Sequence, residues 1–370
     1  MSKDLEAGVQ WESSMLAFMH RQLRVKQPAS TPKSGTQFAS QTAIVTGSNV
    51  GLGFESSRQL LALGLSTLIV AVRCVPKGEA AASALRTEFP DADVRVWILD
   101  MASYDSITAF ARRCDKELDR LDIVILNAGV AMNDFQISSV TGHELVLQVN
   151  YLSTALLAIL LLPIVRKRRE RLNRADDAQL PPARLSFAGS DTVYWSVLNN
   201  PRTIQNLLNQ LGDGRASFLE QFDQPEGYNM DIAYQRSKVL LLAFVARLAE
   251  EYVNPDEVVV NCVNPGLSTE STFLRDGVKP TKNWLLNRLS ELFLNAFSRP
   301  IAVAASNYID AILWKGKESH GSFVSDWAIK PYPAIGYSKE GQAFLAKIWD
   351  ETLGELKFVG VESILNGMKK

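Results

Sequence analysis

The sequence predicts an α/β fold in which a doubly wound parallel sheet forms one domain behind a helical N-terminal extension. Two patterns support this prediction. Beyond residue 40, short runs rich in β-branched residues alternate with longer segments of helical periodicity, which is typical of parallel strands joined by helical crossovers. The first run also leads through a glycine-rich turn directly into a helical segment. Ligands bind such sheets beyond the carboxyl ends of the strands, so we expect the functional residues there.

Seven mostly apolar runs are the candidate strands, and their continuous apolar character predicts burial on both faces of the sheet. They cover residues 43–46, 67–72, 94–99, 122–126, 184–188, 258–263 and 322–325. The helical segments between them cover approximately residues 52–63, 76–88, 103–118, 142–167 and 234–252. The series predicts one Rossmann domain over residues 41–330, with an N-terminal extension and linker over 1–40 and a C-terminal extension over 331–370.

The N-terminal extension has an apolar pattern of roughly helical spacing, formed by Leu5, Val9, Leu16, Met19 and Leu23. This pattern predicts an amphipathic helix over residues 5–25. Docking of the helix on the protein's own core is the simpler interpretation, and contact with a membrane surface is the alternative. The longest apolar run, residues 151–165, is too short to span a membrane, so we expect a buried helix and no transmembrane segment.

Composition and charge narrow the class of function. Hydrophobic residues make up 46% of the 370 residues and charged residues 21%, which fits a chain with a sizeable core. A net charge of −1 gives no reason to expect nucleic acid, and the one basic run, residues 166–169, is typical of a solvated helix end. The three cysteines and three histidines are scattered, which predicts neither disulfides nor a metal site. Because the first residues resemble no targeting signal, we expect a cytoplasmic location.

The glycine-rich turn covers residues 46–53, Thr-Gly-Ser-Asn-Val-Gly-Leu-Gly, between the first predicted strand and a helix. Glycines let the backbone approach a pyrophosphate closely. The helix N-terminus supplies N–H donors and the positive end of the helix dipole. This strand, turn and helix together predict nucleotide binding.

The spacing of Gly47, Gly51 and Gly53 resembles the glycine loop of short-chain dehydrogenases/reductases, and three further motifs follow in that family's order. Asp100-Met101 follows the third predicted strand, Asn127-Ala128-Gly129 the fourth, and residues 264–269, Asn-Pro-Gly-Leu-Ser-Thr, the sixth. In the family these motifs contact the adenine, support the site and lie near the nicotinamide. The resemblance therefore implies that a dinucleotide is held by Gly47, Ser48, Asn49, Gly51, Leu52, Gly53, Arg73, Lys77, Asp100, Met101, Asn127, Ala128, Gly129, Tyr234, Lys238, Pro265, Gly266, Leu267 and Thr269.

The end of the second predicted strand indicates which dinucleotide is bound. An acidic residue there would hold a free ribose hydroxyl, whereas a cation would accept a 2′-phosphate. The strand ends at Arg73, Lys77 follows, and no acidic residue occurs at the tip. A guanidinium presents a planar fork to phosphate oxygens, so we expect the cofactor to be NADP(H). A surface arginine without a ligand is the alternative.

Tyr234 and Lys238 lie four residues apart at the start of a predicted helix, so both side chains can address one ligand. The pair matches the catalytic Tyr-x-x-x-Lys of the family. Reduction of a carbonyl needs a proton donor beside the carbonyl oxygen, and we expect Tyr234 to be this general acid/base. A neighbouring ammonium would lower the pKa of the phenol. The resemblance implies that Lys238 has this effect and also holds the nicotinamide ribose.

Two further residues complete the site that the resemblance implies. Ser190 follows the fifth predicted strand, where the family keeps the serine that hydrogen-bonds the substrate oxygen. Asn150 resembles the asparagine that supports a proton relay, and a polar residue inside a helix is the alternative interpretation.

One departure from the family pattern concerns the spacing of Ser190 and Tyr234, which are 234 − 190 = 44 positions apart, whereas the family typically uses little more than a dozen. The inserted residues 191–233 either shape specificity or form an ordinary packed excursion. They contain several aromatic residues, as does the segment 268–299 in the family's substrate-covering region. Both segments predict a bulky, apolar small-molecule substrate.

The resemblance covers residues 42–326 and is closest to the fungal, retinol-dehydrogenase-like branch, through residues 49–53, the N-terminal helix and Ser325-Asp326-Trp327. It implies oxidoreduction between a ketone or aldehyde and an alcohol, in some members within secondary-metabolite biosynthesis. An isomerase or cyclase on the same fold and a non-catalytic dinucleotide sensor are the alternatives. The sequence leaves the oligomeric state open, including a homo-oligomer.

Overall fold

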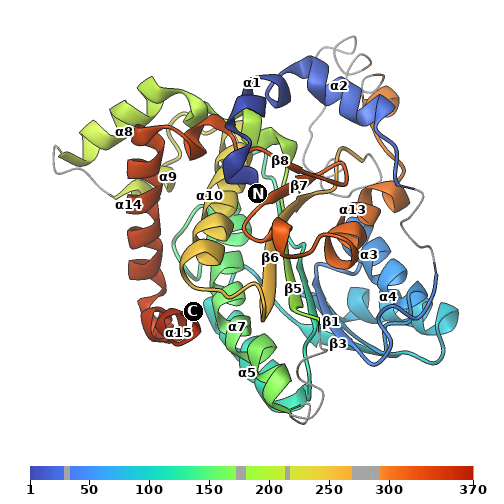
Figure 1. Ribbon diagram of the computed structural model, residues 1–370. Coiled ribbons are helices and arrows are strands. Elements are labelled where there is room, and N and C mark those ends of the chain that lie inside the picture. Colours follow the sequence, from blue (N-terminus) through green and yellow to red (C-terminus); the bar gives the residue numbers. More distant parts are fainter. Residues whose placement is uncertain are drawn as a thin grey trace.

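The computed structural model describes residues 1–28, 34–171, 181–212, 217–268, 288, 292 and 294–369. Its centre is a sheet with the order β3-β2-β1-β4-β5-β6-β7-β8 (Figure 1). The strands are β1 (Thr42–Thr46), β2 (Thr67–Val72), β3 (Asp93–Ile98), β4 (Ile123–Leu126), β5 (Ala183–Ala188), β6 (Val258–Asn264), β7 (Phe323–Ser325) and β8 (Ala328–Lys330). The seven predicted strands are confirmed within one residue at each end, and all seven are parallel.

Strand β8 was not predicted from the sequence, and it pairs antiparallel with β7 at the edge of the sheet. The two residues between them, Asp326 and Trp327, have φ angles of 54° and 58°. Such a turn normally uses asparagine or glycine, because bulky residues rarely adopt a positive φ. The Asp-Trp sequence therefore gives no hairpin signal, and the turn depends on contacts described below.

Two layers of helices cover the sheet (Figure 1). One consists of α3 (Gly51–Ala62), α4 (Val75–Glu88) and α13 (Ile301–Leu313), and the other of α5 (Tyr104–Glu117), α7 (Ser153–Arg171) and α10 (Met230–Glu251). Alternate residues of β1 point to opposite faces of the sheet. Ile44 packs in the core beneath α5, α7 and α10, and Ala43 and Val45 pack in the core beneath α3, α4 and α13. The prediction of burial on both faces is wrong only for β3, an edge strand that exposes Asp93 and Ile98.

The apolar segment predicted as a buried helix forms α6 (Leu145–Leu147), a π-helical turn (Gln148–Leu152) and α7. Residues Leu145–Lys167 are long and apolar enough to cross a membrane, but 89% of their most apolar window is buried inside the protein. Burial inside the protein accounts for this composition, so the predicted buried helix is confirmed, whereas the expectation that the segment is too short to span a membrane is wrong.

The N-terminal extension contains two short 3-10 helices (Ser2–Asp4 and Glu6–Gly8), α1 (Val9–Glu12) and α2 (Met15–Arg24). The predicted apolar face is wrong, because Leu16 and Leu23 are exposed whereas Ala17, Phe18 and Arg21 are buried. A new helix begins at Ser14, whose side chain caps the amide of Ala17. This cap rotates α2 away from the register of the first residues, so the single pattern over residues 5–25 fails.

The inserted residues form two 3-10 helices (Asp191–Trp195 and Val197–Asn199), α8 (Pro201–Gly212) and α9 (Phe218–Phe222). Phe218 and Phe222 are buried in the main core. The backbone amides of Phe218 and Leu219 both donate to Glu351 in the C-terminal helix α14 (Lys339–Glu355). Apart from the residues next to Ser190, the described part of the insertion therefore fits the second interpretation, an ordinary excursion that packs against the core.

A partly buried histidine joins the insertion to the C-terminal residues. His143 Nδ1 lies 2.7 Å from Asp223 Oδ2, and its Nε2 lies 3.2 Å from Glu355 Oε1. Burial opposes protonation, but these hydrogen bonds prevail and raise the pKa of His143 to about 9. Beyond α14, a 3-10 helix (Leu356–Val359) leads to α15 (Val361–Met368), which packs against α7. Two further 3-10 helices cover Lys317–Ser319 and Ala334–Gly336.

Candidate active site

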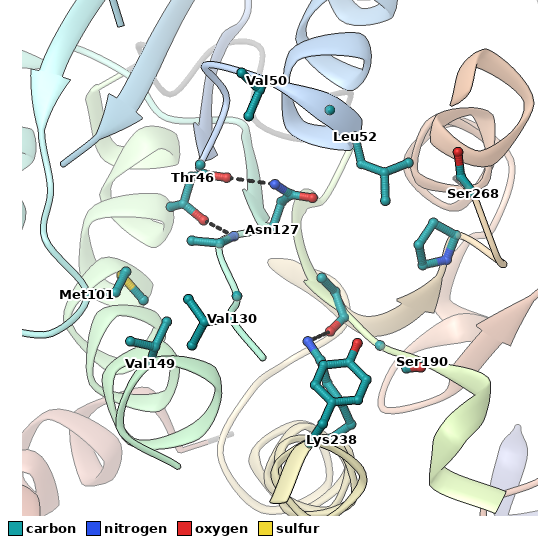
Figure 2. Close-up of a pocket in the computed structure, with 18 of the residues that line it drawn as sticks. Thr46, Val50, Leu52, Met101, Asn127, Val130, Val149, Ser190, Lys238 and Ser268 are labelled. Atoms are coloured by element: carbon teal, nitrogen blue, oxygen red, sulfur yellow. Dashed lines mark hydrogen bonds between the residues drawn. The ribbon is translucent and has the colours of Figure 1, made fainter. Parts of the chain in front are cut away.

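A cavity of about 900 Å³ opens at the carboxyl ends of the parallel strands. The strand order reverses here, because β1 lies between β2 and β4, and ligands of doubly wound sheets bind at this point. Figure 2 shows side chains from the end of β1, from the loops after β4 and β5 and from α10 around this one space. Of the predicted site residues, the cavity is lined by Gly47, Asn49, Gly51, Leu52, Arg73, Lys77, Asp100, Met101, Asn127, Ala128, Gly129, Ser190, Tyr234, Lys238, Pro265, Gly266 and Leu267.

Three described residues of the predicted site do not line it. Ser48 is fully buried, and its hydroxyl donates to the carbonyl of Val45, so it shapes the turn from behind. Gly53 and Asn150 also lie behind the cavity wall. Thr269 lies outside the described residues, as does most of the predicted segment 268–299.

The glycine-rich turn fits an anionic group. Gly47 has a φ of +65°, which favours glycine, and a Cβ on Gly53 would lie 2.5 Å from the carbonyl oxygen of Gly47. Both positions let the chain turn sharply into α3. No side chain caps the N-terminus of α3, so its first amides are available to a ligand. An uncapped helix end facing a cavity is a suitable site for a phosphate.

Thr46 and Asn127 join the ends of β1 and β4 beneath the cavity (Figure 2). The side-chain amide of Asn127 donates to the backbone carbonyl of Thr46 at 3.0 Å. The Thr46 hydroxyl accepts from the backbone N–H of Ala128 at 2.9 Å. Asn127 therefore holds the loop after β4 in place rather than pointing freely at a ligand.

Arg73 and Lys77 lie at the end of β2 and in the first turn of α4, and both are exposed at the cavity. Neither forms an ion pair with another described residue. Asp100, after β3, accepts from the amide of Ala102 at 2.9 Å. Two unpaired cations thus lie at the end of the second strand, where the sequence analysis placed the selection of the cofactor.

Tyr234 and Lys238 lie one turn apart on α10, and both line the cavity. The helix begins one turn earlier than predicted, at Met230, because the side chain of Asn229 caps it. Lys238 is buried, its Nζ donates to the carbonyl of Ala188 at 2.8 Å, and it lies 5.6 Å from the centre of the Tyr234 ring.

Burial controls the charge of this pair. It raises the pKa of Tyr234 to about 12, against a smaller opposing effect of a hydrogen bond with Ser190. Burial also lowers the pKa of Lys238 to about 8. Burial is the largest influence on the Tyr234 phenol, and the lowering of its pKa by Lys238 that the resemblance implies stays a prediction. Tyr234 is a protonated phenol at neutral pH.

Ser190 follows β5 at the cavity and forms a hydrogen bond with Tyr234. The hydroxyl of Thr192, which also lines the cavity, donates to Ser190 Oγ at 3.0 Å. This bond and the hydrogen bond between Ser190 and Tyr234 orient the Ser190 hydroxyl at the cavity. Thr192 was not predicted as a site residue.

Asn150 lies in the π-helical turn and supports the site from behind. Its Oδ1 accepts from the amide of Val130 at 2.8 Å, and its Nδ2 donates to the carbonyl of Val130 at 2.9 Å and to Ser237 Oγ at 3.0 Å. Asn150 thereby ties the loop after β4 to α10, beside Lys238. The structure thus gives its side chain a positioning role.

A buried ionic cluster lies directly beside Ser190. Asp191 accepts from Arg21 of α2 at 3.0 Å and from Asn264 at the end of β6 at 2.8 Å. Arg21 also pairs with Glu12 and with Asp326, the turn residue before β8. Asp326 in turn pairs with Arg299. The cluster fixes the Asp326-Trp327 turn and joins the N-terminal helix to the ends of β5 and β6.

Sequence reasoning missed Arg21, Asp191, Phe18 and Met15. Asp191 follows a predicted catalytic residue, which is a signal that could have identified it. Arg21 gave no signal, because a charged residue on a helix is normally interpreted as its exposed face. Phe18 and Met15 line the cavity, although the helix that carries them lies more than 160 residues before Ser190 in the chain.

Comparison with known proteins gives consistent results. Residues 41–171 match the family model described as short chain dehydrogenase. The short chain dehydrogenase virL of Hypocrea virens is 45% identical over 100% of both chains. The short chain dehydrogenase/reductase mfmJ of Annulohypoxylon moriforme is 40% identical over 95% of this chain and 94% of its own. Both relatives are fungal, in agreement with the resemblance stated from the sequence.

Among solved structures, the RhlG/NADP active-site complex of Pseudomonas aeruginosa matches with a TM-score of 0.54 and 21% identity. The match covers 78% of this chain and 96% of the other. At this identity the likeness concerns the fold, which agrees with the mostly parallel sheet and its two helical layers.

Proposed function

Because the chain belongs to the short-chain dehydrogenase family, we propose that it is an NADP(H)-dependent oxidoreductase that interconverts a ketone or aldehyde and an alcohol on a bulky, apolar substrate. The observation that carries the proposal is the convergence of Ser190, Tyr234 and Lys238 on the cavity that the glycine-rich turn also lines. A sensor needs the turn alone, whereas this site adds a proton donor and a hydrogen-bond donor for a reacting oxygen.

The described residues fit a phosphorylated dinucleotide. The free amides at the start of α3 suit the pyrophosphate, and Arg73 and Lys77 suit a 2′-phosphate. The buried hydroxyl of Ser268 at the cavity has no hydrogen-bond partner among the described residues, so it can bond to a bound group. When bound, NADPH supplies the two electrons for reduction of the carbonyl.

The chain's own residues supply the proton and the positioning. Ser190 donates a hydrogen bond to the carbonyl oxygen and stabilises the negative charge that develops there. Tyr234 then transfers its phenolic proton to this oxygen, which gives the alcohol and a phenolate. A pKa of about 12 keeps Tyr234 protonated before the step. Lys238, held by the carbonyl of Ala188, stabilises the phenolate and binds the cofactor ribose.

The test of the function uses purified protein, NADPH and a series of ketones of increasing apolar size. We expect NADPH consumption with the bulky members and formation of the corresponding alcohols. Tight NADPH binding without turnover of any ketone or aldehyde would instead favour the sensor or the isomerase. A cytoplasmic location, expected because the first residues resemble no targeting signal, and a role in secondary-metabolite biosynthesis, implied by the family resemblance, are further parts of the proposal.

The choice of cofactor gives a separate prediction. Replacement of Arg73 by alanine removes the cation that pairs with the 2′-phosphate, and a charged hydrogen bond contributes about 1.5–3 kcal/mol. We expect Arg73→Ala to weaken NADPH binding by about ten- to a hundredfold and to leave NADH binding nearly unchanged. Titration of both cofactors at one fixed salt concentration measures this, because ions screen phosphate contacts.

The matched control for this prediction is Arg202→Ala, which removes an exposed arginine of α8 that does not line the cavity. This variant should bind both cofactors like the wild type. Equal losses of NADPH and NADH in Arg73→Ala, or equal affinities in the wild type, would show that Arg73 does not select the cofactor.

A further inference from the structure

The wall of the cavity beside Ser190 includes residues from the N-terminal helix. Met15 and Phe18 of α2 line the cavity together with Trp195, which lies five residues after Ser190. Met15 and Phe18 are three residues apart and therefore share one face of the helix. Leu23, on the same helix, is exposed and does not line the cavity. The helix thus presents a defined face to the site.

Phe18 and Trp195 form an aromatic corner. Their rings are 5.3 Å apart and nearly perpendicular, at 73°. The indole N–H of Trp195 donates to the carbonyl of Ser13 at 3.0 Å, which fixes the ring against the start of α2. Phe18 is 7% exposed, whereas Met15 is 51% exposed. A rigid aromatic pair and an adaptable thioether therefore meet at the cavity.

The ionic cluster holds this face in register with the reacting groups. Arg21 lies one turn after Phe18, is 2% exposed and pairs with Asp191, the neighbour of Ser190. Arg299 donates to the carbonyl of Arg21, so the end of the helix is fixed as well. Since both the helix and Ser190 are anchored through Asp191, the aromatic corner keeps a constant position relative to Ser190.

From this arrangement we propose that α2 is part of the substrate site, and that Phe18, Trp195 and Met15 select substrates with a flat aromatic ring next to the reacting carbonyl. Aromatic rings gain edge-to-face contacts with one another, and sulfur also contacts ring edges favourably. A small aliphatic ketone has no aromatic ring and therefore gains no such edge-to-face contact. The inference rests on the proposed function and adds the substrate class.

The test measures binding rather than turnover. Protein saturated with NADP⁺ cannot reduce a ketone, so the affinity for acetylnaphthalene and for butanone can be measured by calorimetry without reaction. We expect the wild type to bind acetylnaphthalene at least about tenfold more tightly than butanone. Phe18→Ala should reduce the affinity for acetylnaphthalene about three- to tenfold, and leave that for butanone and NADP⁺ unchanged.

Met15→Ala provides a second variant, because a half-exposed methionine can be shortened without unfolding the helix. We expect it to weaken acetylnaphthalene binding a few-fold. Leu23→Ala is the matched control on the same helix and should bind both ketones like the wild type. Equal affinities for acetylnaphthalene in all four proteins would overturn the inference, as would equal losses for both ketones.

The two proposals can fail separately. If NADPH reduces ketones but the Phe18 and Met15 variants bind acetylnaphthalene normally, the oxidoreductase function stands and the role of α2 is wrong. If the variants lose affinity for acetylnaphthalene but no carbonyl compound is reduced, the binding role of α2 stands and the reaction is wrong.

Discussion

Replacement of Tyr234 by phenylalanine should reduce turnover by about 10²- to 10⁴-fold, the usual contribution of a positioned general acid. The substitution removes one hydroxyl, the transferable proton, and keeps the ring that packs near Lys238. NADPH affinity should therefore stay close to the wild-type value. Steady-state kinetics with the best ketone of the series and a separate NADPH titration measure the two quantities.

Tyr228→Phe is the matched control for Tyr234→Phe. Tyr228 lies six residues earlier, donates its hydroxyl to the carbonyl of Met132 at 2.8 Å and does not line the cavity. Loss of this hydrogen bond should lower stability by about 1 kcal/mol and leave turnover unchanged. A Tyr234→Phe protein that keeps most of the reductase rate would show that another group supplies the proton.

Replacement of Arg21 by methionine should lower the free energy of unfolding by about 3–5 kcal/mol, because it leaves buried carboxylates without their partner. Arg21 pairs with Asp191 at 3.0 Å, with Asp326 at 3.4 Å and with Glu12. Methionine keeps most of the side-chain volume, so the loss reports the charge rather than a cavity. Urea denaturation followed by fluorescence measures it.

The decrease in the free energy of unfolding caused by Arg21→Met should also depend on pH. Burial raises the pKa of Asp191 to about 6, and Arg21 opposes this rise. Without Arg21 the pKa of Asp191 in the folded protein rises further above that in the unfolded chain. The cost is then greatest above this pKa, where the carboxylate is charged, and is relieved as the pH falls and the group takes up a proton. We therefore expect a larger loss near pH 8 than near pH 5.

Lys3→Ala is the control for this prediction. Lys3 and Glu250 form an exposed pair at 3.2 Å, which should contribute less than about 1 kcal/mol. A similarly small loss in Arg21→Met, or a loss that grows toward acid pH, would contradict the role assigned to the cluster.

The sequence by itself determined the sheet, the crossover helices and the loops at the strand ends that line the cavity, because each of these has a local signal. Apolar runs marked the seven parallel strands, and the loops that follow them carried Gly47, Asn127, Ser190 and Pro265. In a parallel sheet all such loops meet at one edge, so the strand pattern alone places together residues that lie far apart in the chain.

Only the tertiary structure decided the features that depend on charged or ionisable groups buried in the interior. The buried face of α2 contains Arg21, which is stable there only because Asp191 and Asp326 arrive from distant parts of the chain. The positive φ of Asp326 depends on the same cluster, so strand β8 had no local signal. Likewise, the pKa of Tyr234 follows from how deeply α10 and β5 bury the phenol. Removal from water is a property of the whole fold, and a spacing of four residues does not reveal it.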